Sequence, residues 1–374
     1  MFKVNNRSLF LLLLSIYCFS SISIADTIDD YIQCKMKQLK IPGVSIAIVR
    51  NGQIVKSKGY GLSNIELKSP TTSETIYQSG SIGKQFTAML AMILVEKGRL
   101  RLDDKINQYI TDAPDTWKKI TILNLLTHTS GLTRYPLDVD VHLDYSHEDI
   151  IRRLRLYPLD FEPGTSFHYS NVGYMLLGFI LEKVGGKSYD ALLQEHIFKP
   201  LNMGTARVIN ERDIILNRAA GYDLVNGVLK NQEYASPTFN STADGALYFT
   251  VLDLAKWDAA LYTTKLLKKE NMELLWSPVK LSNGKTENYG LGWRLATVNG
   301  HRLIEHGGEW QGFTAFISRY VDQKLTIIIM TNLSGNTELG AITHRIANIY
   351  DNKINMPASE ETGSNTLRNQ ICIH

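Results

Sequence analysis

A serine and a lysine three residues apart, Ser81 and Lys84, stand at the head of the most apolar stretch of the chain. In the run that follows, residues 86–95, Thr87 is the single polar residue, and Gly98 lies just beyond. The run is too short to cross a membrane, and glycine is a common helix stop, so the pattern predicts a helix buried on all sides. Helix positions i and i+3 share a face, which places the two side chains together.

This pair suggests a specific chemistry. A serine hydroxyl is a weak nucleophile until a base takes its proton, and a neutral lysine amine can be that base. Burial and the positive end of the helix dipole both favour the neutral form of Lys84. The Ser-x-x-Lys spacing alone is a weak signal, because it recurs twice within residues 277–285, where nothing would desolvate the lysine. We interpret Ser81 and Lys84 as candidate catalytic residues and the other two copies as surface loop.

Two polar residues, Tyr169 and Asn171, precede an apolar segment with helical spacing at residues 172–184. A phenol and an amide at a helix entry can face a cleft while Ser170 or Asn171 caps the helix. A core tyrosine and a capping asparagine are the alternative interpretation.

A third motif, His306-Gly307-Gly308, falls between two expected strands. Paired glycines at such a position allow a ligand to approach the strand edge closely, or they mark a β-bulge. The pattern by itself does not distinguish these two possibilities.

Composition limits the fold and the function class. The 374 residues are 44% hydrophobic and 21% charged, as in a globular protein with one large domain or two closely packed lobes. The formal net charge is +3 without a basic block, so nucleic-acid binding is not indicated. His142, Asp144, His147 and Asp149 match no zinc-hydrolase spacing, and we interpret them as a solvated acidic loop rather than a metal site.

Residues 1–25 have the pattern of a signal peptide. Lys3 and Arg7 precede an apolar run at residues 9–16, and the small residues Ser23 and Ala25 fit a cleavage site. An uncleaved anchor is the alternative, which the short run disfavours. We expect a mature protein that starts at Asp26, is periplasmic or secreted, and meets the membrane only during export.

Two cysteines, Cys34 and Cys372, remain after the expected cleavage. In an oxidising compartment they could pair and close a long loop. Two unpaired thiols are the equal alternative, since residues 353–374 are polar and predict a disordered tail.

The secondary-structure pattern is strand-rich near both ends and helical between them. A helix is expected at residues 27–39, then a hairpin at 44–50 and 53–59 around Asn51-Gly52. Helical spacing marks residues 120–126, 148–156, 172–184, 189–197 and 250–261. Further strands are expected at 290–298, 302–305, 314–321 and 324–331, before a closing helix at 337–350. One sheet assembled from both ends is therefore predicted.

The three motifs in this order resemble the serine β-lactamase and penicillin-recognising enzyme superfamily. The branch resembled contains class C β-lactamases, D-alanyl-D-alanine carboxypeptidases, D-aminopeptidases and esterases. Further matching segments are Thr-His-Thr-Ser-Gly-Leu at 127–132, residues 161–178 and 197–203, and Tyr-Gly-Leu-Gly-Trp at 289–293. The resemblance covers residues 28–350, nearly all of the expected mature domain.

The resemblance implies an α/β fold of the α+β kind, β-lactamase/transpeptidase-like, for residues 26–352. A central antiparallel sheet flanked by helices would come from residues 26–100 and 287–352. An all-helical lobe would come from residues 101–286, with the site at the seam between the two lobes.

Position by position, the resemblance implies that Ser81 is the acylated nucleophile and Lys84 its base. Tyr169 would relay the proton to the leaving group. The backbone N–H groups of Ser81 and Glu309 would form the oxyanion hole. Such an acyl-enzyme mechanism uses no metal and no organic cofactor.

The substrate side of the site departs from the family pattern. Asn171 would hold the acyl side chain of the substrate or support Lys84, and His306, Gly307 and Gly308 replace the Lys-Thr-Gly of true class C β-lactamases. An imidazole is largely neutral near pH 7, and the threonine hydroxyl is absent. We therefore expect a serine hydrolase of peptides or esters rather than an efficient β-lactamase. A non-catalytic member that binds peptidoglycan or a protein partner is the alternative.

Overall fold

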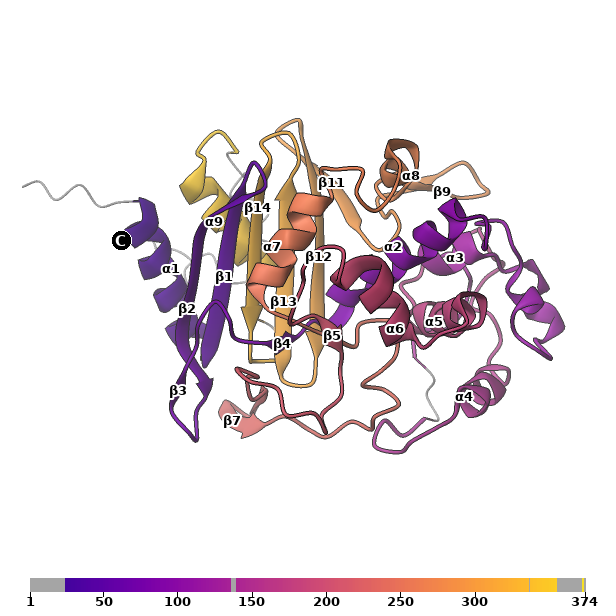
Figure 1. Cartoon of the computed structure of the whole chain (residues 1–374), viewed down its shortest axis with the longest axis horizontal. Coiled ribbons are helices and arrows are strands. Elements are labelled where there is room, and N and C mark those ends of the chain that lie inside the picture. Colours follow the sequence, from indigo (N-terminus) through magenta and orange to yellow (C-terminus); the bar gives the residue numbers. More distant parts are fainter. Residues whose placement is uncertain (1–23, 136–138, 336, 355–371, 373–374) are drawn as a thin grey trace, which may run out of the picture.

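The computed structural model describes residues 24–135, 139–335, 337–354 and 372. A seven-stranded antiparallel sheet stands beside a second, mostly helical lobe (Figure 1). The sheet order is β11-β12-β13-β14-β1-β2-β3, so strands from the two ends of the chain meet where β14 pairs with β1. The predicted fold class, with one antiparallel sheet built from both ends, is confirmed.

The strands of this sheet lie where the sequence predicted them except for β3, which was not predicted, and β2 and β12 continue past their predicted ends at residues 59 and 305. Their bounds are β1 Gly43–Arg50, β2 Gln53–Asn64, β3 Ser69–Pro70, β11 Arg294–Val298, β12 His301–Trp310, β13 Phe313–Tyr320 and β14 Leu325–Thr331. The central strands β1 and β14 are buried along nearly their whole length, because helices cover both faces of the sheet. Successive residues alternate between the two cores, so Ile46 packs into one and Ala47 into the other.

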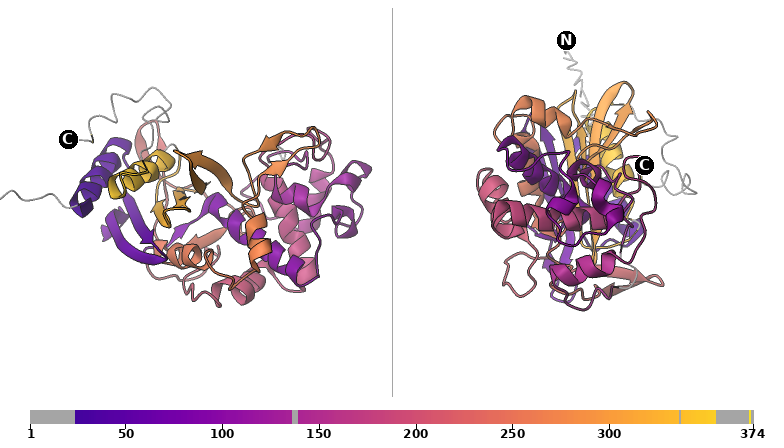
Figure 2. Two further views of the ribbon diagram at one scale, coloured as in Figure 1. Left: turned by 90° about the horizontal axis from the view of Figure 1, so that it is seen from above. Right: turned by 90° about the vertical axis from the view of Figure 1, so that its right-hand side faces the viewer.

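Three long helices cover the two faces of the sheet. Helices α1 (Ile24–Leu39) and α9 (Leu339–Tyr350) lie together on one face (Figure 2), and α7 (Val251–Ala260) packs on the other. The sequence predicted all three within a few residues. Cys34 of α1 is bonded to Cys372, which decides between the two expectations for these thiols. The predicted signal peptide and tail otherwise lie outside the described residues, apart from residues 24, 25, 353 and 354.

The second lobe is built mainly of helices around one buried helix. Its helices are α2 Gly83–Glu96, α3 Ile122–Leu126, α4 His147–Leu154, α5 Asn171–Gly185, α6 Tyr189–Leu193 and α8 Lys269–Leu274, with short turns at Gly80–Ile82, Ile106–Gln108, Asp115–Lys119 and Gln194–Phe198. Residues 83–94 of α2 are all buried, as predicted for the apolar run. Among the described residues, none of the helices is long and apolar enough to span a bilayer.

The expectation of an all-helical lobe over residues 101–286 is wrong in one respect. Short strands also occur there: β5 Arg207–Val208, β6 Tyr222–Val225, β7 Val228–Asn231, β8 Leu247–Phe249, β9 Val279–Lys280 and β10 Thr286–Glu287. Strand β4 (Tyr77–Gln78), which precedes this region, pairs with β8. The hairpin β6–β7 turns at Asn226 and Gly227, which both have positive φ. This Asn-Gly turn between β-rich residues is a local hairpin signal that the expectation of helices between the two strand-rich ends left out.

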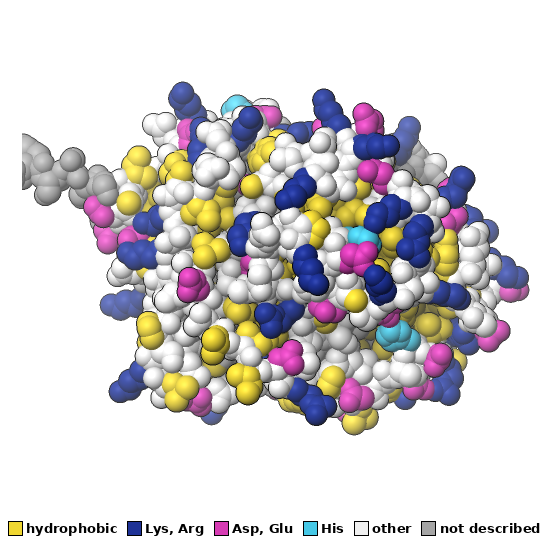
Figure 3. Space-filling model, in the orientation of Figure 1, with side chains coloured by type: hydrophobic (Ala, Val, Ile, Leu, Met, Phe, Trp, Pro, Cys, Tyr) yellow, Lys and Arg dark blue, Asp and Glu magenta, His cyan; other side chains and the backbone are white. Residues whose placement is uncertain are grey.

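The charge distribution agrees with the small net charge. On the face shown in Figure 3, basic and acidic side chains are interspersed rather than gathered by sign.

Candidate active site

Ser81 and Lys84 lie together where a short 3-10 turn runs directly into the buried helix. Ser81 is in the turn Gly80–Ile82, and Lys84 is in the first turn of α2. The Lys84 Nζ atom lies 3.0 Å from Ser81 Oγ, and the lysine side chain is fully buried. The two other Ser-x-x-Lys copies, within residues 277–285, are exposed. Burial therefore singles out the pair that the apolar run predicted.

The other partners of Lys84 are two oxygen acceptors from different segments. Its Nζ donates to Asn171 Oδ1 at 2.7 Å and to the carbonyl oxygen of Asp244 at 2.5 Å. No carboxylate forms an ion pair with it among the residues described. A neutral amine has two N–H donors for these acceptors, and its lone pair then faces the Ser81 hydroxyl. A buried ammonium without a counter-ion would be costly, so the arrangement suits a base.

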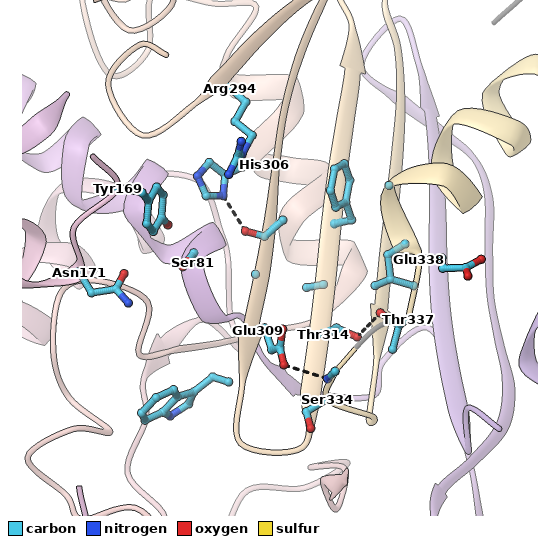
Figure 4. A pocket seen from close by; sticks show the side chains of 18 of the residues that line it. Ser81, Tyr169, Asn171, Arg294, His306, Glu309, Thr314, Ser334, Thr337 and Glu338 are labelled. Carbon is cyan, nitrogen blue, oxygen red and sulfur yellow. Dashed lines mark hydrogen bonds between the residues drawn. The ribbon is translucent and has the colours of Figure 1, made fainter. Parts of the chain in front are cut away.

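Tyr169 lines the same cleft, beside Ser81 (Figure 4). Its hydroxyl is buried and has no hydrogen-bond partner within the described part of the chain, while Lys84 Nζ lies 5.0 Å from the ring centroid. The direct hydrogen bond to Ser81 or Lys84 that a proton relay would use is therefore not formed. A buried hydroxyl without a partner is unusual, and this one is available to a bound substrate.

The entry of α5 shows how Asn171 reaches Lys84. Ser170 is the cap: its Oγ accepts from the backbone N–H of Gly173 at 3.1 Å and donates to the carbonyl of Thr133 at 2.7 Å. This decides which of the two predicted residues caps the helix. The Asn171 side chain is left to support Lys84, one of the two roles expected for it.

The His306-Gly307-Gly308 motif lies inside β12, which corrects the expectation that it falls between strands. The motif pairs with β13 in continuous register, so it forms no bulge. A Cβ atom at Gly308 would overlap Ser79 O and lie 2.9 Å from Ser81 N. The close approach is therefore between the strand and the turn that carries Ser81, rather than with a ligand.

Two backbone donors meet at this contact. A Cβ atom at Gly80 would overlap Glu309 N, so the turn and the strand touch. The two-residue β12–β13 turn, Gln311-Gly312, has positive φ at both residues, so the pair that flanks it, Trp310 and Phe313, is hydrogen-bonded. The next pair is then not hydrogen-bonded, and the Glu309 N–H faces away from β13. Ser81 N–H, in the first turn of its helix, has no intrahelical acceptor. The two predicted oxyanion-hole residues are thus brought together.

A buried polar chain that sequence reasoning missed lines the wall behind Tyr169. Tyr289, 2% exposed, has its hydroxyl 3.2 Å from His128 Nε2 and 3.0 Å from His306 Nε2. Burial is the main cause that lowers the pKa of His306 to about 3 and the pKa of His128 well below its ordinary value, and a proton on Lys84 acts in the same direction. Tyr289 begins the matched Tyr-Gly-Leu-Gly-Trp segment, but no spacing to another polar residue marked it.

Ser81, Tyr169, Asn171 and His306 open onto a cleft of about 1000 Å³ that extends past β13 to the start of α9. Arg134 and Arg294 are exposed and line this cleft, Arg294 beside His306 (Figure 4) and Arg134 with its guanidinium carbon 5.9 Å from the Tyr169 ring centroid. Glu338 lines the part that reaches α9, and Glu309 accepts from the backbone N–H of Gly335. Neither arginine was predicted as a site residue, because neither stands in a motif. Within the described residues, no group of three or more His, Cys, Asp or Glu side chains is placed to hold a metal ion.

Comparisons with known proteins agree with this geometry. The family model named Beta-lactamase matches residues 28–351. Penicillin-binding protein 4* of Bacillus subtilis is 32% identical over 312 residues, which cover 79% of this chain and 69% of that protein. D-aminopeptidase of Brucella ovis is 27% identical over 326 residues, which cover 84% of this chain and 61% of that protein.

A solved structure is similar over the same region. The octameric penicillin-binding protein homologue from Pyrococcus abyssi matches with a TM-score of 0.75 and 31% identity, over 87% of this chain and 77% of that chain. The family match includes both Ser81 and His306, and hence both walls of the cleft. On the family match, the relatives and the fold, this chain belongs to the Beta-lactamase family.

Proposed function

We propose that the protein is an exported serine hydrolase that works through an acyl-enzyme on Ser81. The observation that carries the proposal is the 3.0 Å contact between Ser81 Oγ and the fully buried Lys84 Nζ, which has only neutral oxygen partners. A base held in this way activates a hydroxyl without a metal or an organic cofactor.

The reaction follows from the positions of these groups. Lys84 takes the Ser81 proton as Oγ attacks the substrate carbonyl carbon, and the N–H groups of Ser81 and Glu309 stabilise the oxyanion. The tetrahedral intermediate collapses to an acyl ester on Ser81, and the leaving group receives the proton through the unpartnered Tyr169 hydroxyl. Water, activated by the same base, then attacks the ester and releases the acid.

The substrate side favours peptides or esters over β-lactams. A neutral, buried His306 and a glycine replace the lysine and threonine that a class C β-lactamase uses at this strand, so the motif itself supplies neither a cation nor a hydroxyl. The cation beside His306 is instead the exposed Arg294 of β11 (Figure 4). The similarity to a D-aminopeptidase supports a substrate of the peptide class. Carboxypeptidase, aminopeptidase and esterase activities all share the proposed acyl-enzyme.

The test compares wild type with Ser81→Ala on a short-chain p-nitrophenyl ester and on nitrocefin. We expect ester turnover that Ser81→Ala abolishes, slow nitrocefin turnover, and an acyl adduct on Ser81 by intact mass. Ser282→Ala, at an exposed serine of another Ser-x-x-Lys copy, is the matched control and keeps full activity. Fast nitrocefin turnover would overturn the substrate argument. Absence of any Ser81-dependent turnover or adduct would favour the binding-protein alternative.

Export is part of the proposal and has its own support. The signal-like residues 1–25 and the Cys34–Cys372 bond both suit an oxidising compartment outside the cytoplasm. The buried residues of α1 start at Ile28, so cleavage before Asp26 would remove none of its core contacts. N-terminal sequencing of the exported protein is expected to read from Asp26, and a sequence that begins at Met1 would contradict it.

A further inference from the structure

Three buried side chains form a hydrogen-bonded chain across the seam between the two lobes. His128 follows α3, Tyr289 precedes β11 and His306 lies in β12, and each is at most 2% exposed. We infer that this chain is directional, that it locks both imidazoles in one neutral form, and that Tyr289 is a positioning residue for the Ser81 site. The statement about the Ser81 site rests on the proposed function, whereas the direction of the chain does not.

The direction is set at the end nearest α5. The backbone N–H of Ser170 points at His128 Nδ1 at 3.1 Å, so this nitrogen must accept, and the His128 proton must be on Nε2. The Nε2–H group then donates to the Tyr289 hydroxyl oxygen at 3.2 Å. With its oxygen occupied as an acceptor, Tyr289 donates its own proton to His306 Nε2 at 3.0 Å.

The direction agrees with the constraint at the other end. His306 Nδ1 lies 2.6 Å from the carbonyl oxygen of Gly307, which can only accept, so the His306 proton must be on Nδ1. Two backbone groups, an N–H and a C=O 137 positions apart in the sequence, thus require the same order of protons. One arrangement of hydrogens satisfies every nitrogen and oxygen of the chain.

This order of protons disfavours protonation of His306. Protonation of His306 at Nε2 would place an N–H against the Tyr289 hydroxyl, which could then donate only toward His128 Nε2–H. The titratable groups around His306 are Lys84 from α2, Arg294 from β11, His128 after α3, Tyr169 before α5, and Tyr289. No carboxylate is among the groups that act on it within the described residues, so an imidazolium would have no counter-charge.

The chain bears on catalysis through two neighbours. The His128 ring lies against the Tyr169 ring, with centroids 4.2 Å apart and planes at 33°, so the chain holds the phenol beside Ser81. At the other end, Tyr289 donates to His306 Nε2, so the imidazole of this motif meets the cleft in its neutral form. Tyr289 would therefore set the position of Tyr169 and the neutrality of His306.

The wild-type protein provides the first test, by NMR of selectively ¹⁵N-labelled histidine. We expect His128 to carry its proton on Nε2 and His306 to carry its proton on Nδ1, with both unchanged from pH 7.5 to pH 5. Signals are assigned from the His128→Gln and His306→Gln variants among the nine histidines. The opposite tautomer at either residue, or a His306 titration midpoint above pH 5, would overturn the inference.

The Tyr289→Phe variant provides the second test, since it removes one hydroxyl from the middle of the chain. We expect His306 to become titratable, with a midpoint at least one pH unit higher than in wild type. Tyr77→Phe is the matched control: it removes another buried hydroxyl, bonded to Ser45, from a residue that does not line the cleft, and leaves both histidine signals unchanged. Unchanged signals in a folded Tyr289→Phe protein would contradict the inference. If that variant does not fold, the wild-type tautomers alone decide the inference.

Activity separates this inference from the proposed function. Tyr289→Phe is expected to lower kcat/KM for the ester by roughly 10- to 100-fold, the order of effect of a small misplacement, and to add an acid limb to the pH profile. If wild type has no ester turnover, the proposed function fails while the tautomer measurement still stands. If turnover is normal and Tyr289→Phe leaves the pH profile unchanged, the positioning role is wrong.

Discussion

The two walls of the cleft are built in different ways. On one wall, Ser81 and Lys84 are three positions apart and belong to one continuous turn and helix. On the other wall, His128 is 161 positions from Tyr289, which is 17 positions from His306, and three separate segments bring them together. The first wall is local structure that the rest of the protein buries, and the second exists only in the folded protein.

The walls also differ in the protons that they can hold. Lys84 meets two obligate acceptors and one hydroxyl, so both its neutral and its charged form have hydrogen bonds. The histidine chain is bounded by a fixed donor and a fixed acceptor, so a single neutral form fits. The walls thus differ in their hydrogen-bond partners: Lys84 has a hydroxyl partner that can donate or accept, whereas each end of the histidine chain meets a backbone group that can act in only one way.

The largest expected effect comes from breaking the reactive wall. Lys84→Met keeps the length and burial of the side chain but removes the base, so ester kcat is expected to fall by about 10²–10⁴-fold. Steady-state kinetics measure this loss. Lys280→Met, at an exposed lysine with the same spacing to a serine, is the control and should change kcat little. Equal effects of the two substitutions would refute the role of burial.

The next effect concerns the contact that joins the two walls. Gly308→Ala places a Cβ atom against the backbone of Ser79 and should displace the turn that carries Ser81, lowering kcat/KM by about 100-fold. Overpacking of this kind costs about 1–3 kcal/mol in the free energy of unfolding. Gly307→Ala is the matched control, because its Cβ atom meets the Phe316 ring at 3.0 Å, where the side chain can shift. A larger effect at Gly307 would contradict this account.

A smaller effect, on stability, tests the neutral wall. Below the ordinary histidine pKa of about 6.5, the unfolded chain binds a proton at each histidine that folded His306 and His128 do not bind. The free energy of unfolding should therefore fall as pH drops from 6.5 toward 4.5, by up to about 1.4 kcal/mol per pH unit for each of the two residues. Urea denaturation at several pH values measures the slope.

The His306→Gln variant isolates one histidine in that slope. It removes the group whose pKa is about 3 in the folded state. The free energy of unfolding should then fall less steeply between pH 6.5 and 4.5, by the share of one histidine proton, which is up to about 1.4 kcal/mol per pH unit. The salt-bridged Asp29, with its pKa lowered to about 2, affects stability only below about pH 4 and does not interfere. An unchanged slope would show that His306 takes up a proton in the folded protein.

The smallest expected effect concerns the helix cap behind Asn171. Ser170→Ala removes the cap of α5 and should cost about 1 kcal/mol in the free energy of unfolding. Thr250→Ala removes the equivalent cap of α7, away from the cleft, and should cost a similar amount. Only Ser170→Ala is expected to lower kcat/KM, by a few-fold, because α5 presents Asn171 to Lys84. Equal loss of activity in both variants would indicate a general effect of stability.

Much of the fold was predictable because its signals are local. The all-buried apolar run marked α2, and the Asn51-Gly52 turn between β-rich residues marked the β1–β2 hairpin. The Asn226-Gly227 turn is an equal signal, yet the expectation of a helical lobe hid the β6–β7 hairpin. The π turn at Gln194–Phe198, within the helix expected at residues 189–197, has no local signature.

The site was predictable to the extent that its groups stand in motifs. Ser81, Tyr169 and Asn171 line the cleft and Lys84 is buried directly behind Ser81, but Tyr289 was not identified as a site residue. The strand position of His306-Gly307-Gly308 was also missed, because glycines lower the apparent strand signal. A glycine is needed at position 308 because the turn that carries Ser81 packs against it, and that turn is not part of β12.

The amino-acid sequence alone determined the buried helix, the spacing of Ser81 and Lys84 on it, and the strands at both ends of the chain. These properties depend on periodicity and on contacts between near neighbours, which a short window of sequence records. Only the tertiary structure decided that Cys34 is bonded to Cys372, that Gly308 touches the Ser81 turn, and that Tyr289 joins two histidines. Those contacts join segments distant in sequence, and packing alone sets their distances and the direction of their protons.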